Sequence, residues 1–126
     1  MPITIDWYDV EKTILRYEFT GQWSWEELHQ AMDEVQEQMA SVSTRVDVII
    51  DVSQSKRIPA GALSQMRGGT LKASENWGMG VFVGTGTFLN ALLTTFSRVY
   101  PKMGQRYQSA STTAEAYQLI LKNRKL

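Results

Sequence analysis

The segment from residue 46 to residue 52 constrains the fold of this chain more than any other part. Its sequence is Val-Asp-Val-Ile-Ile-Asp-Val, so five of its seven residues are β-branched and apolar. Such residues favour strands, and a strand with few polar interruptions is typical of a parallel sheet covered by helices. The segment therefore predicts an α/β domain built on a parallel sheet.

The rest of the chain supplies the other strands and the helices. Residues 3–7 and 15–19 alternate apolar and polar side chains, and the short polar link between them predicts an antiparallel hairpin. Further along, we expect a helix from Ser24, a helix near Pro59, a strand at 78–83, a helix at about 87–100, a strand at 106–109 and a terminal helix after Thr112. Strands separated by helices imply parallel pairing with right-handed crossovers, so we expect a single domain over residues 1–126.

Two of the predicted helices begin with a recognisable cap. Ser24 with Glu27, and Thr112 with Glu115, have the spacing at which a hydroxyl and a carboxylate satisfy free backbone N–H groups. After Ser24, the large apolar residues recur every three or four positions, at Trp25, Leu28, Met32, Val35 and Met39. This pattern predicts one buried helix face, with Glu26, His29, Asp33, Glu37 and Gln38 on the outer side.

The composition excludes several classes of function. The chain has no cysteine, which removes disulfides, thiol nucleophiles and cysteine-rich metal sites. Thirteen basic residues balance thirteen acidic ones, which argues against a nucleic-acid partner. The N-terminal residues lack the pattern of a secretion signal, and no uncharged apolar run is long enough for an integral membrane segment. We therefore expect a cytoplasmic protein.

No set of residues suggests catalysis. The one histidine, His29, falls on the polar side of its predicted helix, so no base stands beside a serine nucleophile. Asp47 and Asp51 lie on one face of the same strand, but we expect Asp47 to face solvent at the strand entry, because charged groups are rarely buried without a partner. We expect no enzymatic activity, no metal and no cofactor.

The carboxyl end of the buried strand is the predicted binding edge, because open α/β sheets bind ligands there. Its candidate residues for a partner or ligand are Asp51, Ser53, Ser55, Lys56, Arg57, Thr85, Thr87 and Arg98. Two alternatives stay open here. Asp51 either caps the following turn or contacts the ligand. The segment 84–87 either cradles an anion with its backbone N–H groups or forms a simple turn with Thr87 as the helix N-cap.

Two apolar features also have more than one interpretation. We expect Trp25 in the core, whereas Trp23 either packs on Leu28 ahead of the cap or offers a stacking platform. The predicted helix at 87–100 is apolar over most of its circumference. It either fills the core, lines a pocket for an apolar ligand, or forms the seam of a homodimer.

Several segments together resemble the SpoIIAA-like branch of the STAS-type domains. They are GQWSW at 21–25, VDVIIDVS at 46–53, VFVG at 81–84 and FSRVYP at 96–101. The resemblance implies a singly wound β/α superhelix, with a mixed sheet of four or five strands, an N-terminal antiparallel hairpin and about four helices. Lipid-carrying Sec14-like domains share this fold class.

The resemblance also implies a function. STAS-type antagonists of anti-sigma factors carry a phosphorylatable serine at the start of the helix after the third strand. Here Pro59, Ala60 and Gly61 stand at that place, without a hydroxyl. We therefore expect a non-catalytic regulatory module that binds a protein partner, such as a regulatory kinase, without this serine switch. The alternative is a carrier of a small, lipid-like apolar ligand. In either case we expect a homodimer.

Overall fold

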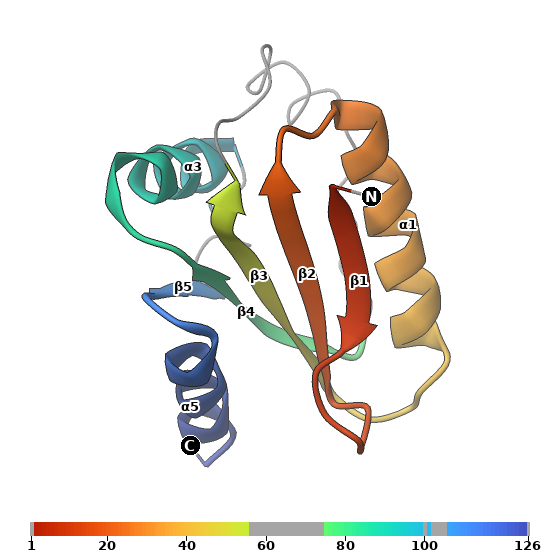
Figure 1. Ribbon diagram of the computed structural model, residues 1–126. Coiled ribbons are helices and arrows are strands. Elements are labelled where there is room, and N and C mark those ends of the chain that lie inside the picture. Colours follow the sequence, from red (N-terminus) through yellow and green to blue (C-terminus); the bar gives the residue numbers. More distant parts are fainter. Residues whose placement is uncertain (1, 56–74, 100, 102–105, 126) are drawn as a thin grey trace.

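A computed structural model describes residues 2–55, 75–99, 101 and 106–125 of the chain. In chain order the described elements are β1 (Ile3–Trp7), β2 (Ile14–Gly21), α1 (Trp25–Ala40), β3 (Val46–Ser55), β4 (Trp77–Val83), α3 (Gly86–Val99), β5 (Tyr107–Ala110) and α5 (Thr113–Arg124) (Figure 1). Every element predicted within these residues is present, with bounds that differ by a few residues. The helix predicted near Pro59 lies outside the described residues.

The five strands form one sheet in the order β1-β2-β3-β4-β5. β1 pairs antiparallel with β2, placing Ile3 opposite Phe19, and the remaining neighbours are parallel. Each strand thus lies beside the one that precedes it in the chain, as expected for a singly wound sheet. This arrangement confirms the predicted α/β class, the mixed sheet and the N-terminal hairpin.

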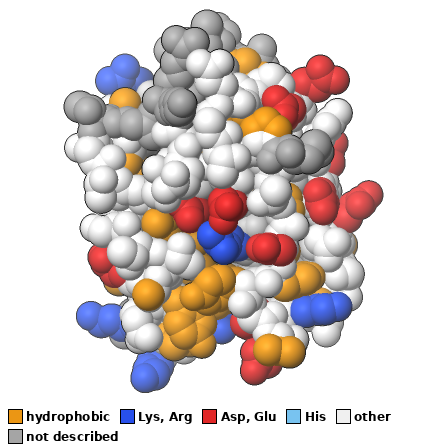
Figure 2. Space-filling view, viewed as in Figure 1, with side chains coloured by type: hydrophobic (Ala, Val, Ile, Leu, Met, Phe, Trp, Pro, Cys, Tyr) orange, Lys and Arg blue, Asp and Glu red, His pale blue; other side chains and the backbone are white. Residues whose placement is uncertain are grey.

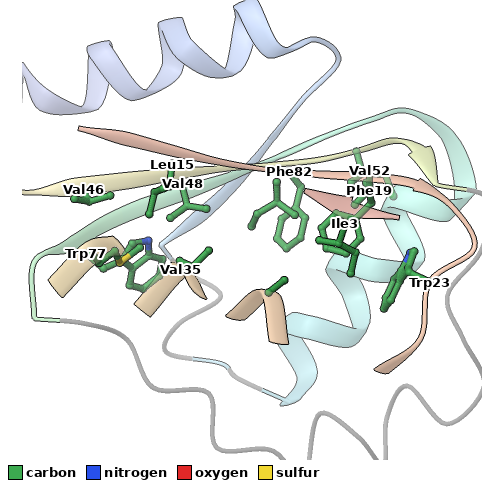
Figure 3. Packing of buried hydrophobic residues seen from close by; sticks show 14 residues of the cluster. Ile3, Leu15, Phe19, Trp23, Val35, Val46, Val48, Val52, Trp77 and Phe82 are labelled. Carbon is green, nitrogen blue, oxygen red and sulfur yellow. The ribbon is translucent and has the colours of Figure 1, made fainter. Parts of the chain in front are cut away.

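The helices cover the two faces of the sheet unequally. Figure 3 shows the sheet nearly edge-on, with α1 and α3 on one side and α5 on the other. On the first side, Val35 and Met39 of α1 and Leu89 of α3 pack against the strands in a large buried cluster. On the second side, Ala116 and Ile120 of α5 cover a smaller one. The smaller layer leaves part of that face open to solvent.

The larger cluster joins residues of the strands β1 to β4 with residues of α1 and α3. Its labelled members in Figure 3 include Phe19 of β2, Val48 of β3 and Phe82 of β4. Aromatic rings contact one another along it: Phe19 meets Trp23 edge-on at 5.1 Å between ring centroids, and Phe82 lies 5.2 Å from Tyr107. Burial of these large apolar side chains, at about 1.5–3 kcal/mol each, holds α1 and α3 to the sheet.

The predicted caps are present. The Ser24 hydroxyl accepts from the backbone N–H of Glu27 and the Glu27 carboxylate accepts from the N–H of Ser24, which completes the capping box. At α5, the Thr112 hydroxyl accepts from the N–H of Glu115, while the Glu115 carboxylate accepts from the N–H of Ser111. Both caps therefore form, and only the first is fully reciprocal.

Three details differ from the expectations. Trp23 is the more buried of the two tryptophans and packs between Phe19 and Trp25, whereas Trp25 is only half-buried. A buried ring cannot serve as a stacking platform.

Gln38 is half-buried because its Oε1 accepts from Nε1 of Trp7. α3 begins at Gly86, so Thr87 lies within the helix and is not its N-cap. None of the described helices is long and apolar enough to cross a membrane.

Candidate functional site

A β-bulge shapes the carboxyl end of β3. Glu18 pairs with Asp51 and Thr20 pairs with Gln54, so β3 carries one more residue than β2 between these pairs. The extra residue would leave backbone donors without partners in the ladder. Asp51 Oδ1 satisfies one of them, accepting from the N–H of Ser53 at 3.0 Å and also from its hydroxyl at 2.6 Å. The capping alternative for Asp51 is therefore the geometry observed.

The second oxygen of Asp51 belongs to a charged cluster on the open face of the sheet. Arg16 Nη2 lies 3.4 Å from Asp51 Oδ2 and also pairs with Glu18. Asp6 stands directly opposite Arg16 in the β1–β2 register. Figure 2 shows a basic side chain enclosed by acidic ones near the middle of this face. Asp51 is only 7% exposed, and its two carboxylate oxygens contact Ser53 of the bulge and Arg16 of the ion pair.

The hydroxyl residues at this edge divide into two kinds. Ser53 and Thr85 are exposed, and they lie close together because Asp51 pairs with Val83 two residues before each of them. Ser55 is half-buried, and its Oγ accepts from Nε1 of Trp23 at 2.9 Å. The edge around Ser53 and Thr85 therefore presents neutral hydroxyls, while Ser55 holds a core tryptophan.

The other predicted site residues are placed less closely or not at all. Arg98 is exposed in the last turn of α3, about 17 Å beyond Thr87 at the helical rise per residue. It therefore does not join Thr85 at the carboxyl edge. Lys56, Arg57 and the side chain of Thr87 lie outside the described residues. So do the side chains of Phe88, Leu92, Phe96 and Val99, on which the apolar-ligand alternative depends.

Asp47 contradicts the prediction that it faces solvent, since its side chain is 0% exposed. Arg45 Nε donates to its Oδ1 at 3.0 Å, and Arg124 Nε donates to its Oδ2 at 2.8 Å. The N–H of Met79 also donates to Oδ1 at 2.8 Å, where β4 carries an extra residue opposite Asp47. Two guanidinium groups and a backbone N–H compensate for the hydration that the Asp47 carboxylate loses on burial. The prediction that Asp47 faces solvent did not include these partners.

A glycine makes room for this ion-pair network. A Cβ at Gly78 would stand 2.0 Å from Arg45 Nε and 2.2 Å from Asp47 Oδ1. Any side chain here would displace the arginine from the carboxylate. Arg124 also donates from Nη2 to the carbonyl of Thr13 at 2.9 Å. The network thus connects the last turn of α5 to the starts of β2, β3 and β4.

Beside the network lies an open, polar depression at the amino-terminal edge of β3 and β4. It has a volume of about 630 Å³ and is lined by Ser43, Arg45, Glu75, Asn76, Trp77, Gly78, Arg106 and Asn123. Sequence reasoning did not find this group. The lining residues come from four separate segments, and no periodicity or motif connects them. One usable signal was Asp47 itself, a carboxylate within an otherwise apolar strand.

Two tyrosines of the described residues have pKa values raised by their surroundings. Burial raises the pKa of Tyr17 above its ordinary value of 10.0 and nearby Tyr107 raises it further. Burial likewise raises the pKa of Tyr107, although the charge of Arg106 opposes the effect. Both phenols stay protonated at neutral pH. His29 is exposed, as predicted, and the described residues contain no group of three potential metal ligands.

The sheet order, the N-terminal hairpin and the placement of the helices define the class of fold. A similar structure is the crystal structure of an uncharacterized DUF3478-family protein with a SpoIIAA-like fold from Shewanella loihica PV-4. It superposes with a TM-score of 0.64 at 14% sequence identity, over 93% of this chain and 90% of that one. The chain thus has a SpoIIAA-like fold, as the sequence resemblance predicted. No protein-family model and no curated protein matches it.

Proposed function

We propose that this chain is a non-catalytic, STAS-like interaction module that presents the carboxyl-end edge of β3 and β4 to a regulatory protein partner. The SpoIIAA-like fold supports the proposal at the level of architecture. The edge supports it at the level of chemistry, because the exposed described side chains there include the neutral hydroxyls of Ser53 and Thr85, and the carboxylate that contacts Ser53 is already paired with Arg16. Such a surface suits hydrogen bonding to a protein better than bond cleavage.

The observation that carries the proposal is the engagement of Asp51. A carboxylate at the ligand-binding edge of an α/β sheet is the natural base or metal ligand of an enzyme. Here one oxygen accepts from Ser53 and the other faces Arg16, and the side chain is almost fully buried. The Asp51 carboxylate therefore stabilises the β-bulge that carries Ser53. A rigid, bulged strand end gives a partner a defined surface.

Site-specific photo-crosslinking in cells that express the protein natively tests the proposal. The crosslinking residue is placed at Ser53 or Thr85 on the edge, and at Glu34 of α1 or Gln118 of α5 as matched exposed controls. We expect one discrete crosslinked protein from the two edge positions alone. Equal capture from all four positions, or capture from the controls only, would place the interaction elsewhere.

Native mass spectrometry of the freshly purified protein separates this proposal from the carrier of an apolar ligand. A protein-interaction module is expected at the mass of the bare chain or of a chain multimer. A retained adduct of a few hundred daltons that organic extraction removes would favour the carrier. The same spectrum tests homodimerisation, which remains a prediction.

A further inference from the structure

We propose that the depression at the amino-terminal edge of β3 and β4 binds the oxyanion group of a small molecule, through Arg45 and Arg106. This site is independent of the carboxyl-end edge proposed above for the protein partner. Each arginine contributes a guanidinium that is already held in place, and the two line the same open hollow. Arginine presents donors in a planar fork that suits phosphate and carboxylate oxygens.

Arg45 is positioned by groups behind it. Its Nε donates to the buried Asp47 carboxylate at 3.0 Å, and its Nη2 donates to Asn123 Oδ1 at 2.7 Å. Its Nη1 makes no hydrogen bond within the described residues, and its side chain remains 40% exposed. The rotamer of Arg45 is therefore fixed before any ligand arrives, which removes part of the entropic cost of binding.

Arg106 is positioned in an equivalent way. Its Nε donates to the carbonyl of Gly78 at 3.1 Å, its Nη2 donates to the carbonyl of Trp77, and its guanidinium lies 4.0 Å from the centroid of the Trp77 ring. These partners are neutral, and Arg106 forms no ion pair with a carboxylate of the described residues. Its positive charge thus remains available to an anion.

The loop that carries Arg45 is itself held in place by Asn76. The Asn76 side-chain nitrogen lies 3.0 Å from the carbonyl oxygen of Met39, 3.2 Å from that of Val42 and 3.0 Å from that of Thr44. These contacts tie the link between α1 and β3 to the segment that enters β4. The two arginines therefore sit on segments fixed to one another.

The local charge also favours an anion. Around the hollow, the positive charges of Arg45, Arg106 and Arg124 outnumber the two negative charges of Asp47 and Glu75. Asp47 is fully buried beneath two of the arginines, so it is screened from the hollow by the groups that it holds. Glu75 is exposed and makes no ion pair with a described cation. Among the described residues it is the one lining carboxylate that would oppose an anion, which gives the test a second variant.

The test is a titration of the isotope-labelled protein with inorganic phosphate and, separately, with acetate, at constant ionic strength set by sodium chloride. The readout is the NMR shift of the arginine Nε–H groups and of the backbone amides around the hollow. We expect saturable shifts with at least one of the two anions, and the stronger binder identifies the ligand as a phosphate or a carboxylate. No saturable shift with either anion would overturn the proposal.

Three variants assign the binding to the site. Arg106→Gln should weaken it about tenfold, since a charged hydrogen bond is lost. Glu75→Gln should tighten it about threefold, and this exposed change is not expected to disturb folding. Lys12→Asn removes one charge from an exposed turn outside the hollow and should leave the affinity unchanged. Equal loss in Arg106→Gln and Lys12→Asn, or no gain in Glu75→Gln, would contradict the assignment.

Discussion

Arg124 in the last turn of α5 reaches the buried carboxylate of Asp47 in β3, with 2.8 Å between Nε and Oδ2. The two residues are separated by 77 positions in the sequence. Asp47 has no contact with solvent, so the arginines that surround it replace the hydration of its charge. This pair fastens the C-terminal helix to the centre of the sheet.

The first prediction concerns the contribution of the Arg124–Asp47 ion pair to stability. Arg124→Ala should lower the free energy of unfolding by about 2 kcal/mol, because Asp47 keeps Arg45 but loses half of its ionic partners. Urea denaturation followed by circular dichroism measures the change. Lys125→Ala, which removes an exposed charge one residue later, is the matched control and should have little effect. Equal losses in the two variants would show that the buried pair adds no stability.

The second prediction concerns acid stability and Asp9. Burial raises the pKa of Asp9, but hydrogen bonds from the Thr13 hydroxyl and from the N–H groups of Thr13 and Ile14 outweigh it and hold the pKa below its ordinary 3.8. A carboxyl group with a lowered folded pKa stabilises the protein above 3.8, and this contribution is lost as the pH falls through the folded pKa.

Asp9→Asn should therefore destabilise the protein at neutral pH, and the difference from the unmodified protein should shrink as the pH falls below 3.8. Urea midpoints measured across this pH range provide the test. Asp6→Asn, in the neighbouring strand, serves as a comparison at an exposed carboxylate. A difference between Asp9→Asn and the unmodified protein that is constant at every pH would contradict the linkage.

The third prediction concerns Tyr17 and Tyr107, which are partly buried against the larger cluster. Because burial raises the pKa of Tyr17 and of Tyr107, neither phenol should ionise in the folded protein near its ordinary value of 10.0. The unfolded chain does ionise there, so stability is retained below that value and falls as the pH rises above it.

An ultraviolet titration of phenolate formation tests whether the phenols of Tyr17 and Tyr107 ionise in the folded protein. Tyr17→Phe and Tyr107→Phe should leave the reversible phase, recorded before alkaline unfolding, unchanged. A smaller reversible phase in Tyr17→Phe would show that this phenol is open to solvent.

The fourth prediction concerns the packing of Tyr107 across β4. A Cβ at Gly80 would stand 2.2 Å from Cε1 of the Tyr107 ring, so the ring occupies the space of a side chain. Gly80→Ala should cost about 1–3 kcal/mol by forcing the ring away. Gly84→Ala, in the turn after the same strand, is the control, because its Cβ would approach no described atom closer than 3.4 Å. Thermal unfolding should separate the two variants, and similar stabilities would contradict the close contact.

The secondary structure within the described residues was predictable because its signals are local. The alternation at Ile3–Trp7, the apolar run that starts β3 and the capping box at Ser24 each depend on side chains a few residues apart. Parallel pairing then followed from general rules on strands separated by helices, whereas the sequential strand order was implied by the family resemblance. The same rules placed Ser53 and Thr85 at one edge.

The sequence was misleading where a side chain's environment depends on distant partners. Asp47 was expected in solvent because an unpaired buried charge is costly, and that physical rule holds. The sequence did not reveal that Arg45 and Arg124 lie beside the carboxylate and pair with it. Trp23 was similarly underestimated, since its burial depends on Phe19 and on Ser55 in a different strand.

Local sequence patterns were sufficient for the kind of each described element, for the α/β class and for the lack of cysteine chemistry. Backbone geometry converts local periodicity into helices and strands, so no distant information was required. The burial of particular charges and the meeting of two arginines at a common hollow came from the folded arrangement of the chain. Those outcomes depend on distances between segments remote in the chain, because electrostatic and hydrogen-bond energies are set by separation in space.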